Sequence, residues 1–267
     1  MIELFNEINN NYGARYTKIQ KELFCEFVQN YLHNFAINCK IERERNNANI
    51  VIGDIENADL VISAHYDTSN EYRYAFLSGV TNNYISSIKY FLSSYKSYAT
   101  AKNKNNLYNY NDNTSGVCCT LELAKLNNKR VAFVLFDNEE NNLKGSRIFY
   151  KKHKRIFENK LLLNLDCVGC GDYLGIVYYT YFNEQYADLF LPYFSKGGNV
   201  FKIMPVNNYA TDAKIFKKAL NVSCYYKKNN DYVFYNIHTK NDNIIENKNL
   251  NRVVENLSDY IKETLPC

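Results

Sequence analysis

Carboxylates follow an apolar stretch of this chain in a way that suits a metal site. The run 131–136 (VAFVLF) is continuously apolar, and Asp137, Glu139 and Glu140 come directly after it. A strand buried on both faces that ends in adjacent acids is unfavourable unless a positive charge lies there. Taken alone, the stretch fits an acidic surface turn equally well. Other segments of the chain decide between these interpretations.

The same pattern recurs at several other places. Side chains that could bind a metal follow three further apolar stretches, namely His65 after 60–64, Asp166 after 161–165 and His238 after 231–236. Another, Asp112, stands at the start of a predicted helix. The chain has only four His, and the other two lie in helical, surface-like stretches. In an open α/β sheet, ligands bind at the carboxyl ends of the strands. We therefore expect these side chains to meet at one edge of a sheet.

This set of residue types matches the chemistry of zinc hydrolysis. Imidazole nitrogen and carboxylate oxygen suit Zn²⁺, and two closely spaced zinc ions need a shared carboxylate to offset their repulsion. Zinc lowers the pKa of a bound water, and one carboxylate must stay off the metal to accept its proton. The adjacent Glu139 and Glu140 can divide the roles of base and ligand. Asp67, two residues after His65, is placed to hold that imidazole through its second nitrogen.

The elements that must position these residues follow from apolar periodicity. Apolar runs predict strands, at 36–43, 48–53, 60–64, 131–136, 161–165, 174–180, 200–204, 222–226 and 231–236. Amphipathic spacing predicts helices, at 16–32, 112–126, 143–152, 184–196, 212–219 and around 250–261. Alternating strands and helices predict one three-layer α/β/α domain over 1–267, with a mixed, mostly parallel central sheet.

The span 68–111 is the exception to this alternation. It is polar and rich in Tyr and Ser, and a structureless loop of this length inside a compact domain is improbable. Ile85, Ile88, Leu92 and Tyr95 fall on one helical face, so part of the span is predicted to be helical. It is either a surface insertion or a lid over the strand ends.

Composition narrows the range of partners and compartments. The 32 basic and 28 acidic residues are too balanced to indicate nucleic acid or a membrane surface as a partner. No apolar run is long enough for a membrane helix, and the first residues do not form a signal peptide. The eight Cys do not form a disulfide framework, so they are expected to be reduced thiols in the cytoplasm.

Five short blocks give the chain a specific resemblance. AHYDT, NDNTSGV, FDNEENNLKGS, NLDCVG and IHTKND occur in this order between residues 64 and 242. They resemble the signature blocks of the co-catalytic zinc exopeptidases typified by bacterial leucyl aminopeptidases and aminopeptidase Y. The resemblance implies two zinc ions per chain, a cis peptide bond after the bridging Asp, and one role for each site residue. By this resemblance, Asp112 would bridge the two zinc ions. His65 and Asp166 would bind one ion, and Glu140 and His238 the other. Glu139 would be the general base.

The resemblance implies an aminopeptidase that acts on peptides with a free N-terminus. Cys167 and Ile237, next to predicted ligands, are plausible pocket walls and favour an apolar N-terminal residue. Two features depart from the family. The span between Asp67 and Asp112 is unusually long, and Ala213 stands where the family's Ser/Thr-Asp-His block has His.

Other activities on the same fold remain open. Glutaminyl cyclases resemble this family but use one zinc, and their pockets typically contain Trp, which this chain lacks. Inactive binding relatives usually lose metal ligands, and all of those ligands are present here. A metal-dependent deacylase or carboxypeptidase is a further alternative, although no Arg is evidently placed to hold a substrate carboxylate.

Overall fold

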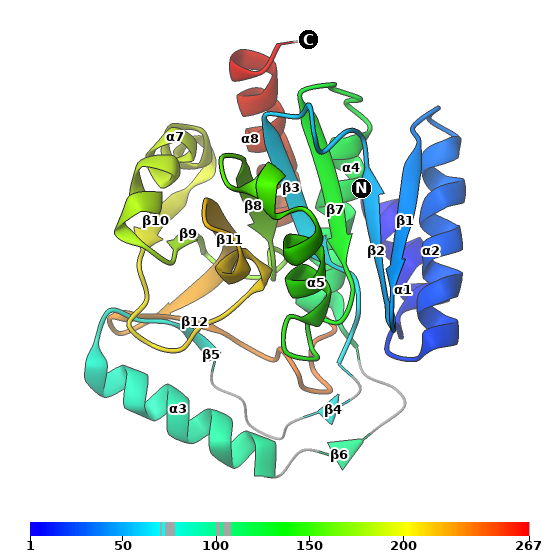
Figure 1. Cartoon of the computed structure of the whole chain (residues 1–267). Helices are drawn as coiled ribbons and strands as arrows, with labels where there is room; N and C mark the ends of the chain where they lie inside the picture. The colour runs from blue at the N-terminus through cyan, green and yellow to red at the C-terminus, as the bar shows by residue number, and fades with distance from the viewer. Residues whose placement is uncertain (70, 73–77, 100–101, 104–107, 267) are drawn as a thin grey trace.

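Apolar runs of the sequence form the central strands of a ten-stranded sheet that helices flank (Figure 1). The computed structural model describes residues 1–69, 71–72, 78–99, 102–103 and 108–266. The helices are α1 (Ile2–Tyr12), α2 (Lys18–His33), α3 (Tyr84–Ala99), α4 (Gly116–Ala124), α5 (Lys144–Lys152), α6 (Lys154–Phe157), α7 (Glu184–Phe194) and α8 (Asn247–Thr264). The strands are β1 (Cys39–Glu44), β2 (Asn47–Ile52), β3 (Leu60–His65), β4 (Glu71–Tyr72), β5 (Ser78–Val80), β6 (Lys102–Asn103), β7 (Val131–Phe136), β8 (Leu161–Leu165), β9 (Tyr173–Tyr178), β10 (Asn199–Ile203), β11 (Ala219–Lys228) and β12 (Asp231–Phe234).

The order of the strands places the ends of β3, β7 and β8 side by side. The sheet runs β1-β2-β7-β3-β8-β11-β12-β5, with β9 and β10 attached to β11. The central strands β7, β3, β8 and β11 are parallel, whereas the β1-β2 hairpin and β12 are antiparallel to their neighbours. Leu60 pairs with both Val131 and Leu161, and His65 pairs with Phe136. The residues that follow these three strands therefore meet at one edge.

Alternate residues of each central strand supply two apolar layers. Val131, Phe133 and Leu135 pack with the helices α1, α2, α4, α7 and α8 on one face. Ala132 and Val134 pack with α5 and α6 on the other. Burial on both faces explains the continuous apolar run of β7. The predicted three-layer α/β arrangement with a mixed sheet is confirmed.

Two parts of the element prediction are wrong. The chain begins with helix α1, which the polar first residues did not indicate. The predicted helix 212–219 is a single 3₁₀ turn over Asp212–Ile215, after which β11 begins at Ala219. β11 pairs with β8 and β9 at its start and with β12 at its end. This pairing on both sides outweighs the short helical pattern, because propensity is a weak prior.

The described parts of the span 68–111 combine two short strand pairings with one helix. β5 adds to the sheet beside β12, and β4 pairs with β6. The predicted helix exists as α3, but Ile85, Ile88 and Leu92 point to solvent instead of covering the sheet. The side chain of Tyr95 lies outside the described part of the structure. In the residues that the structure describes, no helix is both long enough and apolar enough to cross a membrane.

Candidate metal centre

The five predicted metal ligands meet in two groups that share one carboxylate. His65 Nε2 lies 3.1 Å from Asp112 Oδ1 and 3.7 Å from Asp166 Oδ1. His238 Nε2 lies 2.8 Å from Asp112 Oδ2 and 3.2 Å from Glu140 Oε1. Within each group, the ligand atoms all lie within 4.8 Å of one another. The two groups are those that the sequence resemblance implied, with one oxygen of Asp112 in each.

Asp112 is held in place by the residue that follows it. The helical segment before α4 is kinked, with non-helical backbone angles at Asp112 and Asn113, and the peptide bond between them is cis. The predicted cis bond is therefore present. Asn113 Nδ2 donates to the carbonyl of Leu165 at 2.9 Å, and its Oδ1 accepts from the amide of Cys167 at 3.1 Å. These two bonds flank Asp166 and fix it relative to Asp112.

A second connection joins Asp112 to the segment of His238. Both oxygens of Asp242 accept main-chain hydrogen bonds, from the amide of Asn111 at 2.9 Å and from that of Asp112 at 3.1 Å. Asp242 lies four residues after His238, at the end of the next turn. One buried carboxylate thus couples the backbone of the shared ligand to the turn that carries the second histidine.

Asp67 positions the two adjacent glutamates. Its Oδ1 accepts a hydrogen bond from the amide of Glu139 at 2.9 Å, and its Oδ2 accepts one from the amide of Glu140 at 3.2 Å. The Nδ1 of His65 lies 3.1 Å from the main-chain oxygen of Asp67 and 3.6 Å from its carboxylate. The predicted contact with the imidazole is therefore made more closely by the backbone, and the carboxylate mainly orders the glutamate turn.

The third acid of this turn serves the fold. Asp137 is buried and forms an ion pair with Lys21 Nζ at 2.7 Å, while its Oδ2 accepts from the amide of Ala48 at 3.0 Å. Asn138 follows in the left-handed conformation, which turns the chain sharply after β7. Asp137 is engaged by these structural contacts, whereas Glu140 belongs to one of the ligand groups and Glu139 lies beside it in the chain.

The charges of the site favour a cation at its centre. Burial alone would lower the pKa of His65, but the carboxylates of Asp112 and Asp166 outweigh it and hold that pKa well above its usual range. The pKa of His238 is raised in the same way by Glu140 and Asp112. Each set consists of imidazole and carboxylate groups and contains no amino or guanidinium group. Such a donor set fits a divalent ion such as zinc.

Comparison with a protein-family model decides the family. Residues 49–261, which include every residue of both ligand groups, match the model of peptidase family M28. The chain belongs to this family. Among curated protein sequences, none matches the chain significantly.

Several solved structures share the fold of this M28 chain. The LapA aminopeptidase of Legionella pneumophila has a TM-score of 0.70 and 14% identity, over 98% of this chain and 70% of that chain. A glutaminyl cyclase of Porphyromonas gingivalis has a TM-score of 0.65 and 17% identity, over 98% and 96%. A Zn-dependent exopeptidase from Parabacteroides distasonis has a TM-score of 0.65 and 14% identity, over 97% and 94%. At such low identities these likenesses establish the fold and leave the substrate open.

Asp212 is a site neighbour to which sequence reasoning gave no role. It is fully buried, and burial raises its pKa to about 7. Its charge is one of those that raise the pKa of Glu139, so the two carboxyls are close. The only sequence signal was its place in the block Thr211-Asp212-Ala213. Ala213, which replaces the family's His, is buried in the apolar layer beneath α5 and α6.

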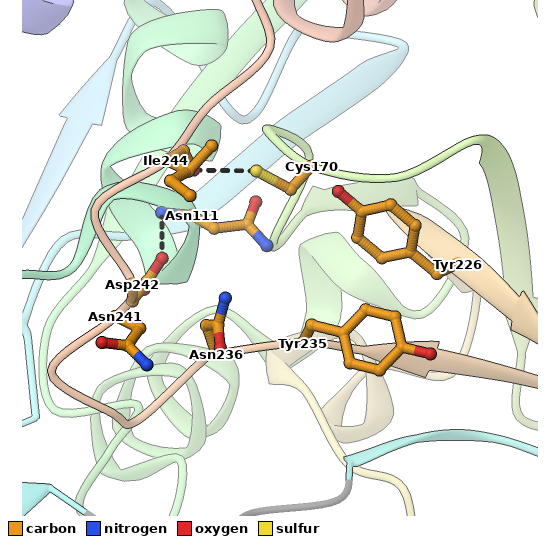
Figure 2. A pocket seen from close by; sticks show the side chains of 8 residues that line it. All are labelled: Asn111, Cys170, Tyr226, Tyr235, Asn236, Asn241, Asp242 and Ile244. Atoms are coloured by element: carbon orange, nitrogen blue, oxygen red, sulfur yellow. Dashed lines mark hydrogen bonds between the residues drawn. The ribbon is translucent and has the colours of Figure 1, made fainter.

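A cavity of about 300 Å³ lies beside the segments that Asp242 joins (Figure 2). Its lining is formed by carboxamide, phenol, carboxyl, thiol and aliphatic side chains, namely Asn111, Cys170, Tyr226, Tyr235, Asn236, Asn241, Asp242 and Ile244. Figure 2 shows the hydrogen bonds from Asn111 to Asp242 and from Cys170 to the Ile244 carbonyl. The cavity shares Asn111 and Asp242 with the scaffold of the metal centre, and none of the seven predicted site residues lines it.

Arg15 is a buried cation that supports the ligand segments from behind. Its side chain is fully buried and donates to the carbonyls of Tyr12 and Tyr66 and to Thr114 Oγ1. Burial lowers its pKa to about 10, so it stays charged at neutral pH. Its main-chain amide donates to Thr68 Oγ1 at 2.9 Å. Arg15 therefore joins the segment after His65 to the segment after Asp112.

We predict that Arg15→Met destabilises the fold by about 3 kcal/mol, because three buried or partly buried acceptors lose their donor at about 1 kcal/mol each. Urea unfolding followed by circular dichroism measures the free energy of unfolding. Arg130→Met is the matched control. Arg130 forms an exposed ion pair with Asp59, and its loss should cost less than about 1 kcal/mol. Equal effects of the two substitutions would contradict the structural role of Arg15.

Proposed function

We propose that this M28 protein is a zinc-dependent aminopeptidase that uses two zinc ions to remove the N-terminal residue of peptides. The observation that supports this most strongly is the pair of His/carboxylate groups that share Asp112. Membership of a peptidase family supports peptide hydrolysis. Two structural neighbours, an aminopeptidase and a Zn-dependent exopeptidase, support the same reaction class.

The residues of the two groups divide the metal-binding roles. His65 and Asp166 would hold one ion, Glu140 and His238 the other, and Asp112 would contact both. Bound zinc supplies Lewis acidity toward the scissile carbonyl and lowers the pKa of water. The two oxygens of Asp112, one beside each histidine, would hold both ions.

Glu139 is the proposed general base. It belongs to neither ligand group, yet it adjoins Glu140 and its amide is held by Asp67. Burial raises the pKa of Glu139 well above the usual carboxyl range, and Glu140 and Asp212 raise it further. A carboxylate whose pKa is raised binds a proton more readily than an ordinary one. Glu139 can therefore accept a proton from water and pass it to the leaving nitrogen.

The neighbourhood of the ligands supports an apolar N-terminal side chain. Cys167 and Ile237 belong to one buried cluster with Tyr225 and Phe234. Cys167 follows Asp166, and Ile237 precedes His238, so this cluster adjoins both metal groups. An apolar wall at that place favours residues such as Leu in the first position of the peptide.

We predict that the enzyme requires a free α-amino group. Acylation removes the basicity of the amine and adds bulk where the metal centre should receive it, so N-acetyl-Leu-Gly-Gly should be cleaved at least about a hundredfold more slowly than Leu-Gly-Gly. Mass spectrometry of the products measures both reactions. Equal cleavage of the two peptides, or the appearance of internal fragments from longer ones, would leave only a generic zinc hydrolase.

Glutaminyl cyclisation is the second candidate, because the P. gingivalis cyclase shares the fold over nearly its whole length. A peptide that begins with Gln distinguishes the two reactions. A cyclase releases ammonia and leaves every peptide bond intact, whereas an aminopeptidase releases free Gln. We expect free Gln, and ammonia release from an intact peptide would replace the aminopeptidase assignment.

A further inference from the structure

Helix α3 presents a continuous apolar face to solvent. Five large apolar side chains of this helix are largely exposed, namely Tyr84 (75%), Ile85 (68%), Ile88 (60%), Phe91 (69%) and Leu92 (59%). Their spacing places them on one side of the helix. Single exposed apolar residues are common, but contiguous patches mark interaction sites. The described part of the chain does not cover this face.

The opposite side of α3 contacts the sheet. The helix therefore has a defined orientation, in which the apolar face is exposed. Thr81 Oγ1 donates to Asp231 Oδ1 at 2.6 Å and accepts from the amide of Asn83 at 2.9 Å. Asn83 Oδ1 in turn accepts from the amide of Ile85 at 2.8 Å, at the first turn of the helix. Tyr90 is buried on the inner side. In Figure 1, α3 lies at the edge of the molecule with its outer side free.

The span 68–111 also carries the whole net charge of the protein. It contains five basic residues and one acidic residue, namely Arg73, Lys89, Lys96, Lys102, Lys104 and Glu71. Subtracting these from the 32 basic and 28 acidic residues of the chain leaves 27 of each sign elsewhere. The net charge of +4 is therefore concentrated in the segment that bears the apolar face.

We propose that α3 binds an anionic lipid surface, lying in its plane with the apolar face inserted. An interfacial helix combines aliphatic and aromatic residues on one face with basic residues beside them. Lys89, four residues after Ile85 and one after Ile88, borders the apolar face and can extend its ammonium group to lipid phosphates. The balanced charge of the chain gave no indication of this surface, because the average conceals the local excess.

Two other occupants fit the same face less well. A second copy would bring two α3 helices together, each with Lys89 and Lys96 and without an acidic residue to compensate. Nucleic acid would satisfy the charge, but it offers no apolar layer for Ile85, Ile88 and Leu92. A bilayer interface provides both an anionic layer and an apolar one.

Co-sedimentation with vesicles tests the proposal. The wild-type protein should sediment with vesicles of equimolar phosphatidylcholine and phosphatidylglycerol, and raised salt should weaken this binding. The double variant Ile88→Asp/Phe91→Asp should bind at least about tenfold more weakly, because charges replace two inserted side chains. Lys89→Glu should weaken binding to the anionic vesicles without altering the apolar face.

A matched control separates this face from other exposed apolar residues. Ile19 and Leu23 on α2 are 75% and 50% exposed, and the double variant Ile19→Asp/Leu23→Asp should keep wild-type binding. The proposal is wrong if the wild-type protein does not sediment or if the control loses binding equally. It is also wrong if light scattering shows a dimer that only the α3 variant dissociates, since a second copy would then be the occupant. Equal binding to pure phosphatidylcholine would overturn the preference for anionic lipid.

Discussion

Glu139→Gln is expected to lower kcat by about three orders of magnitude while zinc content stays at the wild-type level. The substitution keeps the size of the side chain but removes the carboxylate that is proposed to accept the proton. Neither ligand group includes Glu139, and its amide hydrogen bond to Asp67 is independent of the side chain. Steady-state kinetics on an aminoacyl anilide and elemental analysis of the same sample measure both properties.

Glu140→Gln is the neighbouring comparison. Glu140 Oε1 faces His238 Nε2, so this variant should lose affinity for one ion. If the Glu139 variant lost zinc and the Glu140 variant kept it, the two roles would be reversed. The pH profile gives a further check. Because the base must be ionised, kcat/KM should fall as acidification protonates Glu139.

The amino-acid sequence was sufficient to predict the sheet and the residues that gather at its edge. β7 is apolar throughout, and β3 and β8 are mostly apolar, because both faces of these strands are buried, so they could be recognised without an alignment. In parallel strands of matched register, the residues after the strand ends must be neighbours. The positions of His65, Glu139 and Asp166 at or just after the ends of such strands were therefore enough to predict that these three residues lie close together.

The connections between ligand segments could not be predicted in the same way. Asp242 accepts hydrogen bonds from the amides of Asn111 and Asp112, which lie about 130 residues away in sequence. The periodicity of apolar residues does not indicate such a contact. Asp67 was expected to serve His65 with its carboxylate, which lies 3.6 Å from Nδ1, but its hydrogen bonds to the amides of Glu139 and Glu140 were not anticipated. Hydrogen bonds to main-chain amides depend on tertiary placement, and side-chain identity alone does not specify them.

The exposed side of α3 is a second feature that could not be predicted from the sequence. The spacing of apolar residues correctly indicated a helix around Ile85, Ile88 and Leu92. Such a spacing does not indicate which surface, if any, covers the apolar side of the helix. For α8 the stripe packs on the sheet, whereas for α3 it faces solvent. The distinction comes from the position of α3, which follows edge strand β5 and lies outside both helical layers.

Asp112→Asn is expected to lose both zinc ions, with activity falling to background. Each oxygen of Asp112 lies in one ligand group, 3.1 Å from His65 Nε2 and 2.8 Å from His238 Nε2. Asn has the same shape but offers a single neutral oxygen, so it cannot offset the repulsion between two dications. Elemental analysis after dialysis in zinc-containing buffer should give two ions per chain for the wild-type protein and close to none for the variant.

Asp166→Asn distinguishes the loss of a shared ligand from the loss of an ordinary one. Asp166 belongs only to the group of His65, so this variant should keep the ion held by Glu140 and His238. Retention of both ions by the Asp112 variant would show that this carboxylate does not bridge. A wild-type stoichiometry of one at saturation would instead favour glutaminyl cyclisation, because a single ion removes the need for a carboxylate with both oxygens engaged.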